Sequence, residues 1–428
     1  MTYPDELPIV PLAQPPSNTV DVPGSKSITN RALVLAALSG STMLSGLLRS
    51  EDTDVMADCL RRLGIEVTDL GPVSVQVHRP SDGWIPAKQA DLFVGNSGTT
   101  IRFLTAMLAL GEGTYRLDGI PRMRERPIRD LLDALAQLGV DARSEIDNGC
   151  PPVIVRANGL YGGRVRIRAD VSSQFLSGLL MACPFARGDT DIEIEGTPVS
   201  EPYIEMTLAM LRSFGLKVET RGPGRFHIPG GQWHYMSEYV IEPDASSASY
   251  FWAAAAITGG RVSVLGITRK SLQGDVRFVN VLEQMGCRVK EYEADVAGIT
   301  VHGKPLRGID VDMNDISDTV MTLGAVACFA EGPTTIRNVA HIRHKETDRI
   351  AALATELRKL GAEVEERPDG LTITPRPLTG CAVDTYNDHR MAMSLALIGL
   401  RVPGVVIRNP GCVAKTYPGF WQDLERLR

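Results

Sequence analysis

Cations and hydroxyl groups gather in short segments whose chemistry suits the binding of phosphorylated molecules. Lys26, Ser27 and Arg31 lie within PGSKSITNRAL, and three arginines lie between the prolines that bound residues 121–127. Arginine binds carboxylate and phosphate through paired hydrogen bonds, and lysine offers phosphate a point charge. Because the net charge of the chain is −6, these clusters favour a local site for small anions over general nucleic-acid binding.

Further basic residues lie in three later segments. HIRHKETDR spans residues 341–349, NDHRMAM begins at residue 387, and Lys415 precedes the last expected helix. Taken singly, each segment is typical of a solvated loop or of a helix start whose ion pairs are worth about 0.2–0.5 kcal/mol. A site for two phosphorylated molecules needs several lysines and arginines together, so we interpret the segments jointly.

Two repeated elements carry these residues. The first is a short strand, a polar cluster and an Ala/Leu-rich helix closed by Gly. The closing residues are Gly40, Gly113, Gly188, Gly260, Gly332 and Gly404, at steps of 73, 75, 72, 72 and 72 residues. The second is an amphipathic helix that ends in Gly before a β-like run, as is usual for a left-handed C-cap. Its glycines are Gly64, Gly139, Gly215, Gly286 and Gly361, and FWQDLERLR at the C-terminus looks like a sixth such helix.

Six repeats predict an α/β fold with three repeats in each of two domains. The Ala/Leu-rich helices are apolar on nearly all sides, so we expect them to be buried and the strands to form outer sheets. The boundary is expected near residues 239–242, which gives domains of residues 23–241 and 242–428. A generic alternation of strand and helix is the alternative, but it does not explain why a polar cluster recurs in every copy.

Polar clusters at helix starts have two interpretations. Serine, threonine, asparagine and aspartate cap helix N-termini, and capping alone explains any single cluster. Here the clusters also contain Lys26, Arg31, Arg102 and Arg390. Each helix N-terminus adds about half a positive charge and free N–H groups. We therefore expect the helix starts of each domain to converge and to bind anions.

The composition argues against several classes of protein. No apolar run approaches the ~20 residues of a membrane helix. Residues 1–20 contain no Lys or Arg, so neither a secretory signal nor a transit peptide is predicted. The seven cysteines are scattered without a CxxC pair, which favours reduced thiols over a zinc site. We expect a cytoplasmic protein without a nucleic-acid or membrane partner, a metal or a cofactor.

Motifs in order along the chain resemble the 5-enolpyruvylshikimate-3-phosphate synthase family. They are PGSKSITNRAL, GNSGTTIRF, PRMRERPI, SSQF, SEPY, DISDTVMT, HKETDR, NDHRMAM and the segment of Lys415. The resemblance covers nearly the whole chain from about Pro23, and HKETDR and GNSGTTIR are its most specific parts. It implies the two-domain enolpyruvyl transferase fold, in which the domains close over the substrates. It also implies that residues 1–22, with a strand over about 9–21, cross back to the second domain.

The resemblance further implies which residues bind the substrates, shikimate 3-phosphate and phosphoenolpyruvate. Shikimate 3-phosphate is expected to contact Ser27, Arg31, Ser172, Ser173, Gln174, Ser200, Tyr203, Asp318, His341 and Lys345. Phosphoenolpyruvate is expected to contact Lys26, Gly98, Arg126, Gln174, Arg349, Arg390 and Lys415. Asn96 and Thr99 are expected to shape the loop between them.

Two positions depart from the family pattern. His341 stands where many members have Asn, and Phe103 stands where several members have Pro. Glyphosate, which competes with phosphoenolpyruvate, is the inhibitor that the family implies. Gly98, in place of the Ala of many insensitive members, favours sensitivity, whereas Phe103 leaves the question of sensitivity open.

The implied reaction places specific demands on side chains. A hydroxyl of shikimate 3-phosphate must attack C2 of phosphoenolpyruvate, whose phosphate leaves by C–O cleavage. The route needs an acid to protonate C3 and a base for the hydroxyl, and each transfer typically contributes about 10²–10⁴-fold. We assign Asp318 as base and Glu346 as acid, with Lys26 and His389 assisting. Neither a metal nor a cofactor is needed, and we expect a monomer.

Three alternatives remain for comparison. A UDP-N-acetylglucosamine enolpyruvyl transferase should have Lys-Asn in the first motif and a Cys in the mobile loop, whereas this chain has Lys26-Ser27 and no Cys in residues 121–127. An RNA 3′-phosphate cyclase should need a His that becomes adenylated, for which the KETDR segment gives no reason. A non-catalytic anion-binding scaffold should release no phosphate from the two substrates.

Overall fold

Six apolar helices form the inside of the fold. They are α1 (Lys26–Ala37), α3 (Gly98–Leu108), α5 (Ser173–Ala182), α7 (Ala245–Thr258), α9 (Val320–Ala327) and α11 (His389–Gly399). Every residue of α3, α9 and α11 is buried. These helices follow the polar clusters of the sequence, and their lack of a polar face explains why they are internal.

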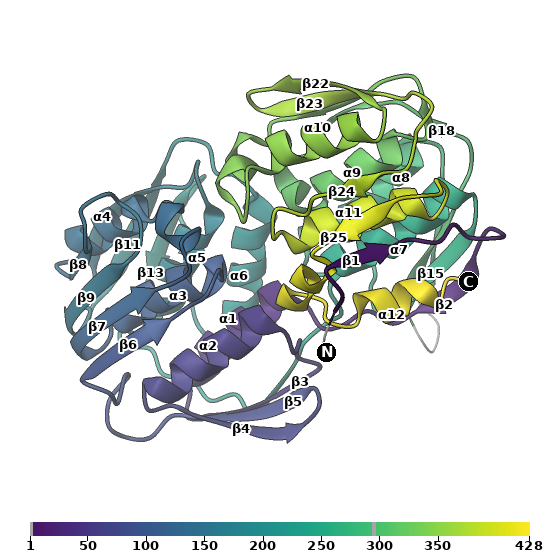
Figure 1. Ribbon diagram of the computed structural model, residues 1–428. Helices are drawn as coiled ribbons and strands as arrows, with labels where there is room; N and C mark the ends of the chain where they lie inside the picture. The colour runs from purple at the N-terminus through teal and green to yellow at the C-terminus, as the bar shows by residue number, and fades with distance from the viewer. Residues whose placement is uncertain (1–2, 293–296) are drawn as a thin grey trace. The chain divides into compact units, whose positions relative to one another are not determined.

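The computed structural model describes residues 3–292 and 297–428. By its internal contacts the chain divides into two compact units (Figure 1). We call residues 24–241 the N-terminal unit and residues 1–23 with 242–428 the C-terminal unit.

The N-terminal unit contains three four-stranded sheets of one topology. In each sheet two parallel strands are followed by two antiparallel ones. The strand orders are β14 (Glu238–Val240), β3 (Ser41–Ser45), β5 (Ser74–His78), β4 (Glu66–Gly71); β6 (Gln89–Phe93), β7 (Glu112–Asp118), β9 (Val153–Asn158), β8 (Asp141–Ser144); and β10 (Gly163–Arg168), β11 (Thr190–Glu195), β13 (Arg225–Ile228), β12 (Glu219–Thr220).

The C-terminal unit repeats this topology. Its sheets are β2 (Ser17–Val20), β15 (Arg261–Leu265), β17 (Gly298–His302), β16 (Arg288–Tyr292); β19 (Asp310–Asp312), β21 (Thr334–Arg337), β23 (Gly370–Thr374), β22 (Glu363–Arg367); and β24 (Ala382–Val383), β25 (Val406–Arg408), β1 (Glu6–Pro8), with a short pair β18 (Leu306–Arg307) and β20 (Ala330–Glu331). In the three-stranded sheet, β1 takes the antiparallel place beside β25. The predicted α/β class of six repeated units with buried helices is confirmed.

Each repeat also contains a second helix, which in four of the repeats packs against neighbouring strands. These helices are α2 (Glu51–Arg62), α4 (Arg129–Gln137), α6 (Glu201–Ser213), α8 (Phe278–Gln284), α10 (Arg349–Lys359) and α12 (Phe420–Glu425). In Figure 1, α10 lies beside the β22–β23 hairpin that follows it. The five glycines after α2, α4, α6, α8 and α10 all have positive φ, between 77° and 115°, which confirms the predicted left-handed C-caps.

Two expectations need correction. A single strand over residues 9–21 is wrong, because the chain forms β1 and β2 with residues 9–16 outside any strand. Pro11, Pro15 and Pro16 lie in that gap, and proline has no N–H to donate to a sheet. The closing Gly113 lies inside β7 and not at a helix end. A Cβ there would collide with the Lys88 carbonyl, so the neighbouring strand requires the glycine.

None of the helices in the described residues combines the length and the apolar character that a membrane crossing requires.

Candidate active site

The start of α1 in the N-terminal unit combines a capping serine with a lysine. Ser25 caps the helix by accepting from the amide of Ile28. Lys26 is the first helical residue, and its Nζ lies 3.6 Å from Asp52 Oδ2 at the start of α2. The cap and the cation therefore occur together, so capping and anion binding are compatible roles for this segment.

Arg31 fastens α1 to the neighbouring helices. Its Nε donates to Thr207 Oγ1 at 2.8 Å, and its Nη2 donates to Ser177 Oγ at 3.2 Å. The guanidinium lies 5.0 Å from the ring of Phe103, so this departure from the family pattern supplies a cation–π contact. Burial lowers the pKa of Arg31 to about 10. The side chain therefore stays charged near neutral pH.

The three arginines of residues 121–127 have different surroundings. Arg122 and Arg124 are on the surface, paired with Glu125 and Asp118. Arg126 is 3% exposed, and its Nη1 donates to the Asn96 carbonyl at 2.9 Å and to Asn96 Oδ1 at 3.2 Å. The surface-loop interpretation thus holds for two of these arginines, whereas Arg126 is buried against the Asn96 segment.

Gly98, the first residue of α3, lies directly against Arg126. A Cβ on Gly98 would approach Arg126 Cζ to 2.9 Å, which is too close for an undisturbed contact. The glycine therefore gives the guanidinium the room that it occupies.

Side-chain hydrogen bonds join the starts of three internal helices. Asn30 Nδ2 donates to Thr99 Oγ1 at 2.6 Å, which links α1 to α3. Arg102 Nη1 donates to Gln174 Oε1 at 2.7 Å and to Ser172 Oγ at 3.4 Å, which links α3 to α5. Convergence of helix starts is thus observed within this unit.

The remaining predicted residues of this unit lie beside these helix starts. Ser172 caps α5, and Ser173 is its first residue. Ser200 precedes α6 with φ of +53° and is buried. The carbonyls of Ser27 and Tyr203 both accept from Arg31, at 3.0 and 3.3 Å.

Asp318 holds three cations in the C-terminal unit. Its Oδ2 accepts from Arg390 Nη2 at 2.7 Å, and its Oδ1 accepts from Arg349 Nη1 at 3.2 Å and lies 3.7 Å from Lys345 Nζ. Asp318 belongs to the 3₁₀ helix η4 (Asn314–Thr319), directly before α9. Three helix starts therefore meet at this carboxylate.

Glu346, the second predicted carboxylate, lies beside the first. Its Oε2 accepts from Arg349 Nη2 at 2.8 Å, and its Oε1 is 3.8 Å from Lys415 Nζ. Lys415 ends the 3₁₀ helix η6 (Pro410–Lys415). Arg349 thus joins the two carboxylates predicted to act as acid and base.

Arg349 is held by a further carboxylate, which the sequence prediction omitted. Asp388 caps α11, is fully buried and accepts from Arg349 Nε at 2.8 Å. Burial alone would lower the pKa of the Arg349 guanidinium, but Asp388, Glu346 and Asp318 outweigh burial and raise it. The position of Asp388 before the His-Arg of NDHRMAM was the available signal.

Asp275 is the other omitted carboxylate. It lies in the 3₁₀ helix η3 (Gly274–Arg277), accepts from the Ser246 hydroxyl and is buried. Ser246 in turn accepts from Arg390 at 3.4 Å. Burial, reinforced by the charge of Asp318, raises the pKa of Asp275 to about 6. No motif of the sequence marked this residue.

His341 is a neutral side chain in this structure. Its Nε2 lies 2.9 Å from Ser317 Oγ, and burial, together with the charge of Lys345, lowers its pKa to about 3. His341 lies before α10 and is not part of it. Residues Ala340–His344 form the 3₁₀ helix η5, and α10 begins at Arg349 after the Asp348 cap.

Asp348 and Lys345 have different partners. Asp348 accepts from Arg343 Nη1 at 2.8 Å and from the amide of Ala351, whereas Lys345 is directed to Asp318. The backbone of Lys345 is non-helical, with ψ of −149°, and this break turns its side chain away from the helix.

His389 is fully buried at the first position of α11, with its Nδ1 3.6 Å from Asp388 Oδ1. It belongs to the same charged cluster, and its role in proton transfer stays a prediction. Among the described residues, no group of three or more His, Cys, Asp or Glu side chains is arranged to hold a metal.

Each unit thus presents one charged cluster at the starts of its buried helices. The C-terminal cluster has the carboxylates of Asp318, Glu346, Asp388 and Asp275 among four cations, Lys345, Arg349, Arg390 and Lys415. Such a set can bind an anion and exchange protons next to it. The N-terminal cluster offers Lys26 and Arg126 with hydroxyl and amide groups.

Comparisons with known proteins agree with this geometry. The family model of EPSP synthase (3-phosphoshikimate 1-carboxyvinyltransferase) matches residues 13–424. The chain is 53% identical to the 3-phosphoshikimate 1-carboxyvinyltransferase of Nostoc punctiforme, over 99% of this chain and 100% of that protein. It is 48% identical to the chloroplastic enzyme of that name from Arabidopsis thaliana, over 96% and 82% of the two chains.

Solved structures show the same fold. An EPSP synthase from Acinetobacter baumannii matches with a TM-score of 0.83 and 27% identity, over 99% of this chain and 98% of that one. The enolpyruvyl transferase NikO from Streptomyces tendae matches in fold, with a TM-score of 0.78 and 21% identity over 99% and 97%.

The repeated βα units and the two charged clusters therefore define an enolpyruvyl transferase fold. Within that class, the chain belongs to the EPSP synthase family. The family predicted from the motifs is confirmed, and the UDP-N-acetylglucosamine alternative is not favoured.

Proposed function

We propose that this protein transfers the enolpyruvyl group of phosphoenolpyruvate to the 5-hydroxyl of shikimate 3-phosphate and releases inorganic phosphate. Family membership gives the reaction class. The observation that supports the residue assignment is the pairing of Asp318 and Glu346 through Arg349. It places a candidate base and a candidate acid in one cation-rich cluster.

The proposed reaction proceeds by proton transfers and needs no metal. Asp318 takes the proton of the attacking hydroxyl while Glu346 protonates C3, and the oxygen bonds to C2 to form a tetrahedral intermediate. Loss of a C3 proton to a carboxylate then expels phosphate with the electron pair of its C–O bond. Preorganised cations stabilise the charge that develops on the departing phosphate.

We assign the ligand contacts by unit, as the family resemblance implies. In the N-terminal unit, Lys26, Gly98, Gln174 and Arg126 serve phosphoenolpyruvate, whereas Ser27, Arg31, Ser172, Ser173, Gln174, Ser200 and Tyr203 serve shikimate 3-phosphate. In the C-terminal unit, Arg349, Arg390 and Lys415 serve phosphoenolpyruvate, whereas Asp318, His341 and Lys345 serve shikimate 3-phosphate.

The two compact units are, in this proposal, the two domains of the enzyme.

We further propose a cytoplasmic monomer that glyphosate inhibits in competition with phosphoenolpyruvate. Light scattering at the concentration of the assay tests the monomer, and inhibition kinetics at varied phosphoenolpyruvate test the inhibitor. The structural reason to test glyphosate is Gly98, whose lack of a Cβ lets the Arg126 guanidinium lie against the start of α3.

A phosphate-release assay with both substrates tests the reaction. The wild type should release phosphate only when both are present, and Asp318→Asn should lower kcat by about 10²–10⁴-fold, the usual contribution of a general base. Asp315→Asn is the matched control, because Asp315 is half exposed and pairs with Arg277 on the surface. Turnover of a UDP-linked sugar without turnover of shikimate 3-phosphate would refute the substrate assignment.

A further inference from the structure

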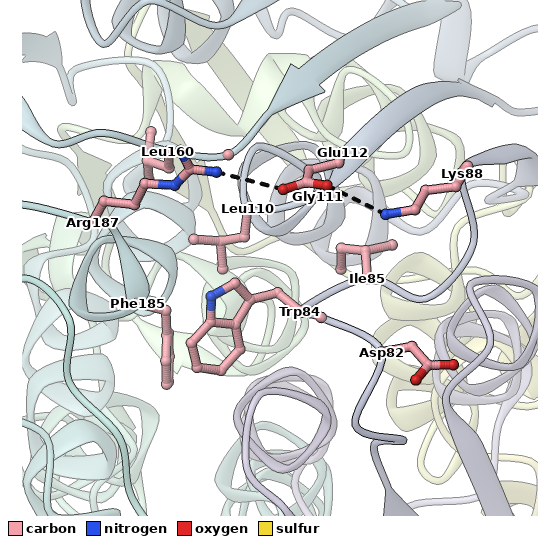
Figure 2. A pocket seen from close by; sticks show the side chains of 12 residues that line it. Asp82, Trp84, Ile85, Lys88, Leu110, Gly111, Glu112, Leu160, Phe185 and Arg187 are labelled. Carbon is pink, nitrogen blue, oxygen red and sulfur yellow. Dashed lines mark hydrogen bonds and ion pairs between the residues drawn. The ribbon is translucent and has the colours of Figure 1, made fainter.

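A cavity lies in the N-terminal unit at the C-terminal end of α3. It has a volume of about 410 Å³ and is lined by residues after the C-terminus of α3 and around the 3₁₀ helix η2 (Cys183–Phe185) that ends α5 (Figure 2). The proposed substrate residues lie at the opposite, N-terminal ends of these helices. Because α3 has 11 residues, its two ends are about 16 Å apart. The cavity is therefore separate from the proposed active site.

The floor of the cavity is apolar and aromatic. Ile85, Leu110, Leu160 and Phe185 are all buried beneath it. The ring of Trp84 meets the ring of Phe185 edge to face, with centroids 4.9 Å apart. Figure 2 shows the two rings side by side below Leu110. Such a surface favours an apolar or aromatic group of a ligand.

Trp84 is held in place by Arg79, and its indole N–H group is available to a ligand. The guanidinium of Arg79 lies 4.7 Å from its ring, and Arg79 Nη1 donates to the Gly83 carbonyl at 2.9 Å. Within residues 3–292 and 297–428, the indole N–H of Trp84 makes no hydrogen bond. In Figure 2 the indole nitrogen is on the side of the ring that faces Leu110. It is therefore available as a donor inside the cavity.

The rim carries charges of both signs. Glu112 lies 3.6 Å from Lys88 Nζ and 3.5 Å from Arg187 Nη2, and all three side chains are more than half exposed. Asp82 adds a second carboxylate to the rim. Long, exposed ion pairs contribute little to stability, so a ligand can exchange for them at low cost. The balanced rim disfavours a purely anionic or a purely cationic ligand.

We propose that this cavity binds a zwitterionic α-amino acid with an aromatic side chain. The aromatic ring packs on Trp84 and Phe185, the carboxylate accepts from Arg187 and from the Trp84 indole, and the ammonium group binds Glu112. The volume lies at the lower end of the range of about 300–1,000 Å³ for small-molecule sites. It admits one amino acid and excludes larger ligands such as dinucleotides.

Contacts between aromatic rings extend from the cavity into the N-terminal unit, so His234 can report on a ligand bound in the cavity. Phe185 is 5.6 Å from the ring of His234, and His234 is 5.6 Å from Phe214. His234 is buried, and neither of its ring nitrogens has a hydrogen-bond partner among the described residues. Its ring resonances should therefore respond to a ligand that displaces Phe185.

Isothermal titration of the full chain with L-phenylalanine tests the proposal. We expect one site with a dissociation constant of about 1 mM or tighter. Phenethylamine, which lacks the carboxylate, and 3-phenylpropionate, which lacks the ammonium group, should each bind at least about fivefold more weakly, since each leaves one rim charge unmatched.

Variants locate the binding. Trp84→Ala and Arg187→Ala should each weaken it about tenfold or more, which corresponds to ~1.4 kcal/mol. Glu219→Gln is the matched control for Glu112→Gln, because both carboxylates are just over half exposed and pair with an arginine in the same unit. Glu112→Gln should weaken binding and Glu219→Gln should not. In NMR spectra, the His234 resonances should shift with the same affinity.

Three results would each overturn the proposal. They are the absence of heat and of His234 shifts at saturating L-phenylalanine, binding of both analogues as tight as that of L-phenylalanine, and unchanged binding in Trp84→Ala. Arg126→Ala separates this site from the proposed active site, because it should leave L-phenylalanine binding intact. Loss of binding in that variant would place the ligand at the other cluster and refute the assignment. None of these readouts requires turnover, so they remain decisive if the proposed function fails.

Discussion

Asp318 and Arg390 form a 2.7 Å ion pair, and they are separated by 72 residues, the spacing of consecutive repeats in this half of the chain. Asp318 precedes α9, and Arg390 is the second residue of α11. Equivalent helix starts of neighbouring repeats therefore supply the two halves of the pair. Internal symmetry is thus the physical reason that the charges of the C-terminal unit meet.

This relationship predicts strong coupling between the two residues. In a double-mutant cycle with Asp318→Asn and Arg390→Met, the free energies of unfolding should be non-additive by about 0.5–3 kcal/mol, the range for contacting residues. The exposed pair Arg277 and Asp315, at 2.9 Å, is the control and should couple by less than about 1 kcal/mol. Urea unfolding of the four proteins measures both cycles. Additivity at the buried pair would contradict the predicted coupling.

Arg349→Met should destabilise the protein severely. Arg349 is 1% exposed and neutralises Asp388, which has no solvent exposure, along with Glu346. Removal of one partner from a buried ion pair typically costs about 3–5 kcal/mol, because the remaining charge is uncompensated. Arg337→Met is the control, since its pair with Asp310 is exposed and should be worth at most about 1 kcal/mol. Equal losses in both variants, measured by urea unfolding, would show that burial does not set the cost.

The sequence predicted the repeats and the clusters because both depend on local chemistry. Gly64 and Gly361 are examples, since only a left-handed C-cap explains a glycine between an amphipathic helix and a strand. The polar helix starts, which were predicted to converge, are in contact, as the hydrogen bond from Asn30 to Thr99 shows. The spacing of the repeats then predicted which helix starts occupy equivalent positions in the fold.

Features that depend on tertiary contacts were not predictable in this way. The non-helical backbone of Lys345, which directs its side chain to Asp318, interrupts a segment that sequence alone assigns to one helix start. Asp275 becomes part of the site only because η3 packs against the start of α7. The cavity at Trp84 combines residues from four separate segments, and no local motif marks such an assembly.

His341→Asn should make the protein less sensitive to acid. The His341 pKa is lowered to about 3 in the folded state, whereas an unfolded histidine has a pKa of about 6.5. The unfolded state therefore binds more protons between these values, and stability falls as pH drops from about 6.5 toward 3 at up to ~1.4 kcal/mol per pH unit.

Asparagine does not titrate, so the stability lost between pH 7 and pH 5 should be about 1–2 kcal/mol smaller in the variant. His302→Asn is the control. His302 lies at the end of a strand and is partly exposed, and burial lowers its pKa as well. Thermal unfolding at pH 5, 6 and 7 measures the difference. Parallel pH curves for wild type and His341→Asn would show that His341 is not held neutral.

Gly98→Ala should weaken phosphoenolpyruvate binding with little loss of stability. The new Cβ would approach Arg126 Cζ to 2.9 Å, so the guanidinium must move away from the start of α3. Arg126 also holds the Asn96 carbonyl at 2.9 Å, and the loop should shift with it. Since displacement of a well-placed charged hydrogen bond costs about 1.5–3 kcal/mol, KM for phosphoenolpyruvate should rise about tenfold or more.

Gly40→Ala is the matched control, because a Cβ there meets nothing within 4 Å. It should leave both KM values unchanged. In Gly98→Ala, KM for shikimate 3-phosphate should also stay near that of the wild type, since the clash falls on Arg126 and not on Arg31. Steady-state kinetics with each substrate varied in turn distinguish these outcomes. A rise in KM for shikimate 3-phosphate alone would reverse the assignment of the two substrates at α3.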